Sequence, residues 1–496
     1  MNRVTVVGCV ILCVSGAGSG LDITATTTAF GGESVRIKLR LFAFALTLFI
    51  VPPLALSQTA GSNSGKESQQ YSTKELHGGI LPPADFTGDL SSRAFLLGDW
   101  GGLRTDLAEK GIRFRGWLTP NLQGVTSGGS EDDTAFGASG DLWFALDLHK
   151  MGAIPGGLLT VRAEFDVGNS VTKSAGTILP PSINAIVPIA GETDRDSLSI
   201  TSLYYTQFLG EKFGVWLGRA DTMHNANLGE FSGLNPQVGN TQFQHFALTA
   251  IPVMPVSQPY VSSLGAGVFA RPTKDLSLAA MIMDSRESSQ RSGLDDFGKD
   301  WNSFFTVNLQ HRLGDLPGGQ LVGFSYSWNG DYTKLENSQL RNLITGTPLQ
   351  SESETWAVIY SAWQYVQVFE GDTSKPINLG DGRADHRGWG VFLMAGLADE
   401  DTNPVQWSVA GGIGGRGLLS SRPNDSFGVG YFLIELKDGV VANLIGLKSA
   451  EQGVEIYYEA EITPWFHITP DLQIIDPSLS ASDTAVILGL RVNISF

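Results

Sequence analysis

The fold class of this chain is decided by residues 485–496, which read AVILGLRVNISF. Every second residue from Val486 to Phe496 is apolar, whereas the residues between them are mostly small or polar, with Arg491 near the centre. A tilted strand of this length can cross a bilayer, because about 9–11 residues suffice. Amphipathic strands of soluble β-sandwiches show the same alternation. The segment alone therefore leaves a membrane barrel and a soluble sandwich open.

The composition agrees with many strands and turns. The chain has 496 residues, of which 60 are glycine and only 17% are charged, against about 25% in ordinary globular domains. An outer surface covered by lipid needs little charge, so the length fits one large closed barrel as well as two to four soluble domains. The net charge of −17 disfavours nucleic acid as a partner, since phosphate contacts need clusters of Lys and Arg.

A secretory signal is predicted at residues 35–57. Arg36, Lys38 and Arg40 precede the apolar run Leu41–Val51, and small residues lead up to a cleavage site before Gln58. We interpret residues 1–57 as an N-terminal extension with this signal, and the first 34 residues suggest a start codon assigned too early. The two cysteines, Cys9 and Cys13, fall in this region, so the mature chain would hold no disulfide and no cysteine metal site.

The mature chain is predicted to begin with two short parts before the barrel. Residues 58–97 are polar and rich in Gly and Ser, which indicates a flexible leader. Residues 98–111 are expected to form a short periplasmic or plug-side helix that ends at Gly111. Trp100, Leu103 and Leu107 share one face of that helix, and we expect this apolar face to dock on the rest of the protein.

Residues 112–496 read as strand after strand, which predicts an all-β transmembrane antiparallel barrel of about sixteen strands. Short links alternate with long ones, as in outer-membrane barrels. A barrel of sixteen strands leaves an aqueous channel, whereas about eight strands would be filled by side chains. The sixteen candidates are residues 112–126, 139–149, 158–168, 198–209, 213–221, 260–271, 275–285, 302–313, 319–329, 354–368, 388–398, 406–418, 426–437, 453–463, 466–475 and 485–496.

Carboxylates, arginine and aromatic residues occupy the polar face of the most clearly alternating strands. Such a face is more typical of a channel lining than of a surface in bulk water, and it offers hydroxyl partners and rings that could stack on sugars. A self-satisfied charge ladder that only keeps the lumen wet is the alternative. The predicted lining residues are Asp141, Trp143, Arg162, Glu164, Asp166, Glu455, Tyr457, Glu459, Glu461 and Arg491.

Motifs that carry catalysis are missing from the sequence. We find no Walker A loop, no H-E-x-x-H and no G-x-S-x-G, and the seven histidines show no metal-ligand spacing. Glu459 and Glu461 could suggest glycosidase chemistry, but lumen charge is the favoured interpretation. The glycine run Gly411–Gly415 reads as a closely packed strand and not as a phosphate loop. We therefore predict no enzyme activity and no cofactor.

Three separated segments resemble the carbohydrate-selective porins of the OprB type. They are GDWGGLRTDLAEKGIRF at residues 98–114, GLLSSRPNDSFGVGYF at residues 417–432 and EIYYEAEITPWFHITPDLQIIDP at residues 455–477. The long N-terminal extension departs from the family pattern. The resemblance implies a sixteen-stranded barrel in the outer membrane of a Gram-negative-type bacterium, with passive diffusion of sugars through a constricted lumen.

The resemblance also sets the expected partners. They are small sugars such as glucose, outer-membrane lipid, and the barrel-assembly machinery, which would read the final strand through Phe496. Association of barrels as a homotrimer is left open. Two alternatives also stay open, namely a general cation-preferring porin, suggested by the acidic composition, and a secreted glycan-binding β protein.

Overall fold

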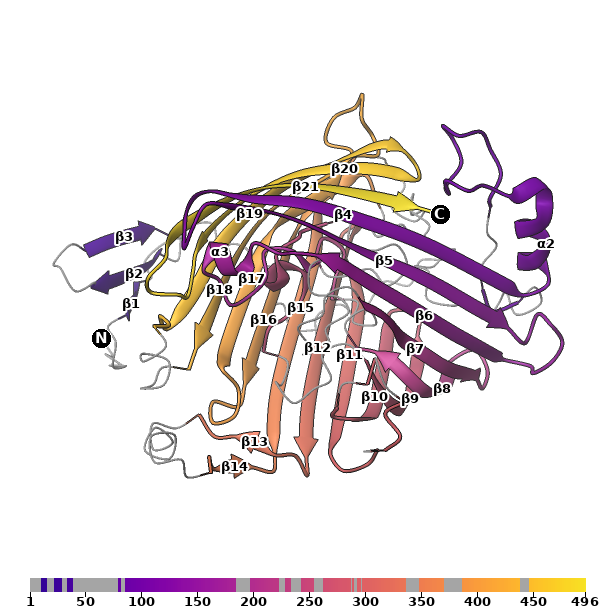
Figure 1. Cartoon of the computed structure of the whole chain (residues 1–496), viewed down its shortest axis with the longest axis horizontal. Coiled ribbons are helices and arrows are strands. Elements are labelled where there is room, and N and C mark those ends of the chain that lie inside the picture. The colour runs from indigo at the N-terminus through magenta and orange to yellow at the C-terminus, as the bar shows by residue number, and fades with distance from the viewer. Residues whose placement is uncertain are drawn as a thin grey trace. The chain divides into compact units, whose positions relative to one another are not determined.

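The computed structural model describes residues 10–15, 22–28, 34–38, 79–81, 85–183, 197–222, 228–232, 242–253, 262–286, 288–289, 292–295, 297–335, 348–369, 386–437 and 446–496. The chain divides into two compact units, residues 1–64 and residues 65–496. In the first unit, β1 (Val10–Ser15), β2 (Asp22–Thr28) and β3 (Ser34–Lys38) form an antiparallel sheet (Figure 1). Residues 39–57, most of the expected signal, lie outside the described residues.

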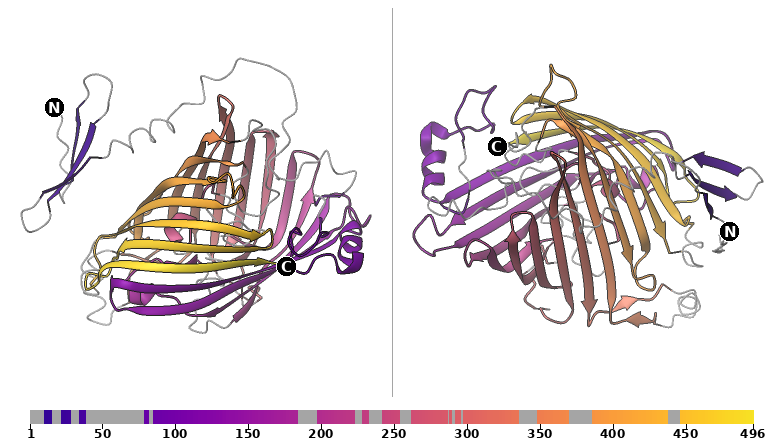
Figure 2. Two further views of the ribbon diagram at one scale, coloured as in Figure 1. Left: turned by 90° about the horizontal axis from the view of Figure 1, so that it is seen from above. Right: turned by 180° about the vertical axis from the view of Figure 1, so that it is seen from behind.

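The second unit is a closed antiparallel barrel of sixteen strands, as the sequence predicts (Figures 1 and 2). Each barrel strand pairs with the next barrel strand along the chain. The link between β12 and β15 contains a separate two-stranded sheet of β13 (Tyr332–Thr333) and β14 (Ser351–Glu352), so β12 pairs directly with β15. The barrel strands are β4 (Ile112–Gly129), β5 (Asp133–Asp147), β6 (Gly157–Gly168), β7 (Ser197–Phe208), β8 (Phe213–Asp221), β9 (Ser262–Thr273), β10 (Leu276–Asp284), β11 (Trp301–Leu313), β12 (Leu316–Trp328), β15 (Thr355–Val368), β16 (Gly388–Ala398), β17 (Val405–Arg416), β18 (Ser426–Leu436), β19 (Ala450–Thr463), β20 (Phe466–Asp476) and β21 (Asp483–Ser495).

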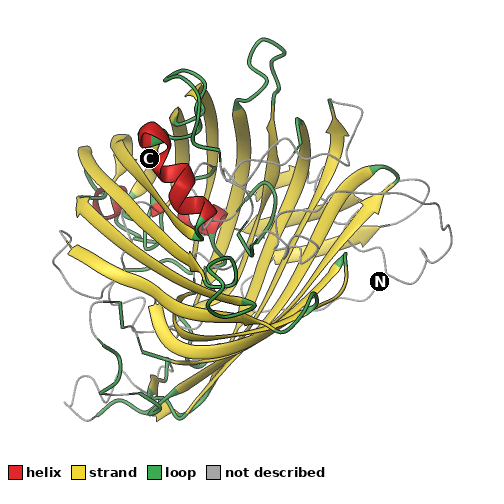
Figure 3. Cartoon of the chain, turned by 90° about the vertical axis from the view of Figure 1, so that its right-hand side faces the viewer, coloured by secondary structure: helices red, strands yellow, loops and turns green. Residues whose placement is uncertain are grey.

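The final strand closes the barrel by pairing with the first. Arg491 on β21 lies opposite Asn121 on β4, and Ser495 lies opposite Trp117. The closed ring leaves no barrel strand with an unpaired edge, so the main-chain polar groups of the wall are hydrogen-bonded within it. Figure 3 shows the tilted strands of this wall in yellow.

Alternation along the strands separates an apolar outside from a polar inside. On β21, Leu488 is 53% exposed on the outer face, whereas Arg491 on the inner face is 0% exposed. The same contrast holds on β5, where Leu142 is exposed and Asp141 is buried. Because successive side chains of a strand point to opposite faces, an alternating sequence produces both surfaces at once.

Strand β5 begins six residues earlier than the sequence pattern indicates, at Asp133 instead of residue 139. Its first part is rich in Gly and Ala, which have little intrinsic strand preference. Main-chain pairing with β4 holds this part extended. At the other end β5 stops at Asp147, whose carboxylate accepts the Lys150 main-chain N–H at 2.9 Å and fixes a turn.

A short helix precedes strand one, but its buried face differs from the prediction. The turn η2 (Trp100–Gly102) leads into α2 (Leu103–Glu109). Leu103, expected to dock, is 52% exposed, whereas Arg104 beside it is only 2% exposed. Trp100 is also exposed, and Ala108 is the other buried residue of α2. The apolar periodicity predicts the wrong buried face because the residue that docks is Arg104, whose guanidinium binds main-chain oxygens.

The Arg104 guanidinium joins three parts of the chain near the seam. Its Nη2 donates to the main-chain oxygens of Phe496 at 2.8 Å and of Phe114 at 3.0 Å, and Nη1 donates to Gly98 at 3.3 Å. Its Cζ lies 4.2 Å from the ring centroid of Phe86 and 4.7 Å from that of Phe95. The N-terminal segment is thereby fixed to both seam strands.

The two ends of the barrel differ in their connections. We call the end at which β4 begins the turn end and the opposite end the loop end. Four of the five longest links between barrel strands, which follow β6, β8, β10 and β12, lie at the loop end, whereas residues 369–387 connect β15 to β16 at the turn end. Two links at the loop end carry short helices, α3 (Thr172–Ala175) and α4 (Phe246–Thr249). Among the described residues, every helix is too short or too polar to cross a membrane.

Candidate functional site: the barrel interior

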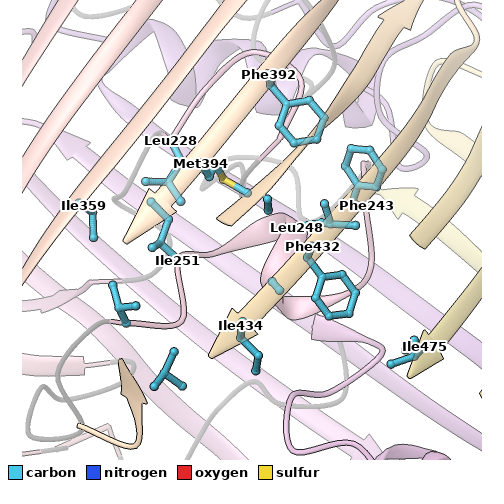
Figure 4. Close-up of a cluster of buried hydrophobic side chains, with 14 of the residues drawn as sticks. Leu228, Phe243, Leu248, Ile251, Ile359, Phe392, Met394, Phe432, Ile434 and Ile475 are labelled. Carbon is cyan, nitrogen blue, oxygen red and sulfur yellow. The ribbon is translucent and has the colours of Figure 1, made fainter. Parts of the chain in front are cut away.

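Part of the long link between β8 and β9 packs against the inner wall. We call residues 228–232 and 242–253 the inward segment. Its apolar side chains join a buried cluster with Phe392, Met394 and Phe432 of the wall (Figure 4). In Figure 4, Phe243 and Leu248 of the inward segment lie beside Phe432. The link therefore enters the barrel instead of standing outside it.

Glycines of the wall make room for the apolar side chains of the inward segment. A Cβ on Gly428 would lie 2.8 Å from Cζ of Phe243, and one on Gly430 would lie 2.7 Å from Cδ2 of Leu248. A Cβ on Gly414 would likewise lie 2.8 Å from Cβ of Phe231. These distances are shorter than normal carbon contacts, so only glycine lets the segment lie this close. The glycines of the 417–432 motif and of the 411–415 run thus acquire a packing role.

Aromatic contacts add to this packing. The ring of Phe243 lies 4.9 Å from that of Tyr457, edge to face, and the His245 imidazole stacks on Phe432 at 3.9 Å. Burial lowers the pKa of His245 to about 3, so its ring is neutral at physiological pH. Its Nδ1 accepts the Ala247 main-chain N–H at 3.2 Å, which caps the start of α4.

Two charged side chains of the wall bind the backbone of the inward segment. The Glu455 carboxylate accepts the main-chain N–H groups of Gln244 at 2.6 Å and His245 at 2.8 Å. Nη2 of Arg491 donates to the main-chain oxygen of Gln242 at 2.6 Å. Charge-assisted hydrogen bonds of this kind are stronger than neutral ones. The inward segment is therefore held at its backbone as well as by its apolar side chains.

Arg491 is surrounded by buried acidic groups. Glu459, Glu455 and Asp471 supply the negative charge that faces its guanidinium. Glu459 also hydrogen-bonds Nδ1 of His467 at 2.6 Å. A buried arginine among carboxylates is stable only because the charges compensate one another.

A second segment, residues 170–183 with α3, also reaches the inner wall. Nδ2 of Asn121 donates to the Ser182 hydroxyl at 2.9 Å, and Nε2 of Gln473 donates to the Pro181 main-chain oxygen at 2.8 Å. The Ile183 main-chain N–H donates to the oxygen of Gln244 at 2.8 Å. This last bond joins the second segment, which we call the α3 segment, to the inward segment.

A separate group of charged residues, which we call the Arg162 group, lies on β5, β6 and β8. Nε of Arg162 donates to Oδ1 of Asp141 at 2.7 Å and lies 2.8 Å from Oε1 of Glu164. Asp221 is 3.7 Å from Nη1 of Arg162, and the Trp117 ring centroid is 5.5 Å from its Cζ. The hydroxyl of Thr201 donates to Glu164 at 2.9 Å. All four charged side chains of this group are buried, each at most 7% exposed.

The structure distributes the ten predicted lining residues over distinct places. Asp141, Arg162 and Glu164 form the Arg162 group, and Asp166 follows on the same face of β6. Glu455, Tyr457, Glu459 and Arg491 lie against or beside the inward segment. Trp143 is half-buried, with Arg115 Cζ 5.8 Å from its ring. Glu461 lies apart at the turn end, where its carboxylate accepts Nδ2 of Asn424 at 2.7 Å.

Sequence reasoning missed the residues of the inward segment. Phe243 and His245 lie in a link without strand or helix periodicity, so no pattern marks them as interior residues. The available signal was the glycines of β16–β18, because glycine within a strand indicates close approach by another part of the chain. Among the described residues, no group of three or more His, Cys, Asp or Glu is placed to hold a metal ion.

These features define a class of protein. A closed sixteen-stranded barrel with an apolar outer wall, a polar interior and chain segments packed inside is the architecture of an outer-membrane porin. In that architecture the short turns face the periplasm and the long loops face the outside. The turn end is accordingly the periplasmic end.

The family follows from the comparison with known sequences. The model of the family described as "Carbohydrate-selective porin, OprB family" matches residues 137–496. The chain therefore belongs to the OprB family of carbohydrate-selective porins, in the outer membrane of a Gram-negative-type bacterium. Porin B from Pseudomonas aeruginosa is 26% identical over 439 residues, which cover 81% of this chain and 91% of that protein.

Solved structures show the same fold. The high-pH structure of OprB from Pseudomonas putida matches with a TM-score of 0.68 at 20% identity and covers 82% of this chain and 100% of that one. The low-pH structure of the same protein matches with a TM-score of 0.51 at 16% identity, over 82% of this chain and 99% of that one. At these low sequence identities, the structural similarity shows a shared fold and nothing further.

Proposed function

We propose that small sugars such as glucose diffuse passively through the part of the lumen that the inward segment and the α3 segment leave open. The observation that carries the proposal is the fixed position of the inward segment. It is seated on wall glycines and bound at its backbone by Glu455 and Arg491. A segment held in this way narrows the channel permanently, which favours small solutes without chemistry or energy input.

We further propose that the Arg162 group supplies hydroxyl partners along the path. Arg162, Glu164 and Asp141 hold one another by short charge-assisted contacts, so their geometry is fixed in advance, and only the small part of them that is exposed would meet a sugar. Trp143 and Asp166 are proposed to share this role. For Glu455 and Arg491 the proposed role is to position the inward segment, since both already bind its backbone.

The second candidate is a general cation-preferring porin. It is favoured by the net charge of −17, because an acidic lumen raises the local concentration of cations. The narrowing by the inward segment favours the sugar channel instead. The porin fold and family suggest that the protein is not an enzyme, and we propose that transport proceeds without catalysis.

Liposome swelling tests the proposed function. Liposomes that contain the purified protein are expected to swell in isotonic glucose much faster than protein-free liposomes, and faster than in an isotonic trisaccharide. Protein unfolded by heat before reconstitution is the control. Glucose permeation no faster than in protein-free liposomes would exclude the sugar channel, and equal rates for glucose and trisaccharide would favour a wider, general porin.

The assembly machinery is proposed to read the final strand and Phe496. That strand closes the barrel, and the main-chain N–H of Phe496 donates to Gly116 of β4 at 2.7 Å. Deleting Phe496 is expected to reduce the yield of folded protein in the outer membrane severalfold, as measured by fractionation and immunoblot. An unchanged yield would contradict this role.

Three further assignments are proposals. Outer-membrane lipid is proposed to cover the exposed apolar residues of the wall, such as Leu142 and Leu488. Residues 1–57 are proposed to be removed on export and residues 58–97 to act as a leader, which N-terminal sequencing of the mature protein tests. Association of the barrels as homotrimers is tested by chemical cross-linking in native membranes. A monomer band alone would exclude the trimer.

A further inference from the structure

Aromatic rings on the inner wall lie over glycines of the neighbouring strand. On β8 and β9 this arrangement is reciprocal. A Cβ added to Gly267 would lie 2.7 Å from Cε2 of Trp216, and one added to Gly214 would lie 2.7 Å from Cε2 of Phe269. Because neither glycine has a side chain, each ring can lie against the wall. Its other face then points toward the lumen.

On the opposite side of the barrel, rings that lie over glycines pack against the inward segment. A Cβ on Gly412 would lie 3.0 Å from Cε1 of Phe392, and one on Gly453 would lie 2.9 Å from Cε1 of Phe432. Those two rings are almost fully buried, since the inward segment covers them. Rings laid against glycines thus form a flat apolar surface on which another apolar group packs.

On β7–β9 the corresponding rings stay partly exposed. Trp216, Tyr204 and Phe269 are each half-buried, and they face inward because their neighbours Leu217, Leu203 and Val268 are exposed on the outer wall. The rings of Tyr204 and Trp216 lie 6.1 Å apart at 66°. Part of the Trp216 ring therefore remains exposed on the inner wall.

Polar groups lie beside these rings. Thr206 is paired with Trp216 across β7 and β8, and Thr160 is paired with Tyr204 across β6 and β7. On β6 the Arg162 group begins two residues from Thr160, on the same face. These polar groups are almost fully buried, so the partly exposed Trp216 ring is the group that a solute with an apolar C–H face would meet.

We propose that Trp216, with Tyr204 beside it, forms a stacking site for pyranose rings in the lumen, on the wall opposite the inward segment. This inference rests on the proposed function and names the site through which sugar would be favoured over other small solutes. The pyranose ring stacks on Trp216 through its apolar C–H face. An open-chain alditol lacks the flat C–H face and gains little from the rings.

Sugar-induced block of single-channel current tests the stacking site. Glucose and sorbitol are compared on wild type and on Trp216→Ala. The concentration of glucose that halves the current is expected to rise about threefold to tenfold in Trp216→Ala, the range set by the loss of one aromatic contact. The concentration of sorbitol that halves the current is expected to stay within about twofold of the wild-type value. Trp216→Phe, which retains a ring, should restore most of the glucose block.

Phe165→Leu provides the matched control, because its ring lies over Gly140 on the outer wall. That variant should keep wild-type glucose block. Tyr204→Leu is the second probe if Trp216→Ala does not fold, and it should also weaken glucose block more than sorbitol block. An unchanged glucose value in a folded Trp216→Ala or Tyr204→Leu channel, or equal shifts for both solutes, would overturn the stacking site. Absence of glucose block and of glucose-driven swelling in wild type would instead overturn the proposed function.

Discussion

Replacing Arg491 with alanine is expected to free the inward segment and to convert a narrow channel into a wider, less selective one. The substitution removes the donor to Gln242 and leaves the buried carboxylates of Glu455, Glu459 and Asp471 without their shared counter-charge. Removing the positive charge that compensates buried acidic groups is expected to destabilise by up to about 3–5 kcal/mol, the cost of breaking a buried ion pair. The main-chain pairing of β21 with β4 and β20 does not depend on the side chain, so the barrel should still close.

Single-channel recording measures this effect. Arg491→Ala is expected to raise the open-channel conductance and current noise severalfold, and to abolish the difference between glucose and trisaccharide in liposome swelling. Leu490→Ala is the matched control on the outer face of the same strand, and it should resemble wild type. A folded Arg491→Ala channel with wild-type conductance and wild-type size selectivity would show that the inward segment does not depend on this side chain.

Arg104→Ala is expected to weaken the closure of the barrel at its periplasmic end. The side chain donates to the main-chain oxygens of Gly98, Phe114 and Phe496, so its loss leaves three main-chain oxygens without their charged donor. Each hydrogen bond to a charged group contributes about 1.5–3 kcal/mol. Burial lowers the pKa of Arg104 to about 10, so the group is still charged at neutral pH.

Heat-modifiable gel mobility measures the stability of the closed barrel. Arg104→Ala is expected to unfold at a temperature lower by about 10 °C or more, because several kcal/mol are lost at once. Leu103→Ala, its exposed neighbour, is the control and should unfold at nearly the wild-type temperature. Arg104→Lys should be intermediate, since one ammonium cannot reproduce the fork of donors. Equal unfolding temperatures for wild type and the three variants would show that the Arg104 hydrogen bonds do not stabilise the closed barrel.

The sequence predicted the structure well where apolar and polar residues alternate along a strand. The two faces of β21 follow from its residues, because each outward position is apolar and the inward Arg491 is buried. The seam with β4 follows from closure of a barrel with sixteen strands. The start of β5 was missed, since small residues in a strand leave no pattern and main-chain pairing alone holds them.

The interior was less predictable, because it depends on partners far away in the chain. Arg491 lies on the inner face of β21, and its partner Gln242 lies 249 residues earlier in a link without periodicity. Arg104 lies outside the apolar face predicted for its helix, and the sequence of a helix gives no sign of main-chain oxygen acceptors elsewhere in the chain. The wall glycines carried the missing information, but only a structure shows that Gly428 faces Phe243.

Glucose-dependent block of single-channel current in a planar bilayer tests the central claim most directly. A narrow channel that admits sugars should lose ion current as glucose rises, since a sugar in the constriction excludes hydrated ions. We expect a saturable decrease in conductance with glucose and a much weaker decrease with a trisaccharide at equal viscosity. A current that follows only the bulk conductivity of the solution, indifferent to which sugar is present, would contradict sugar-selective diffusion and leave a general cation-preferring porin.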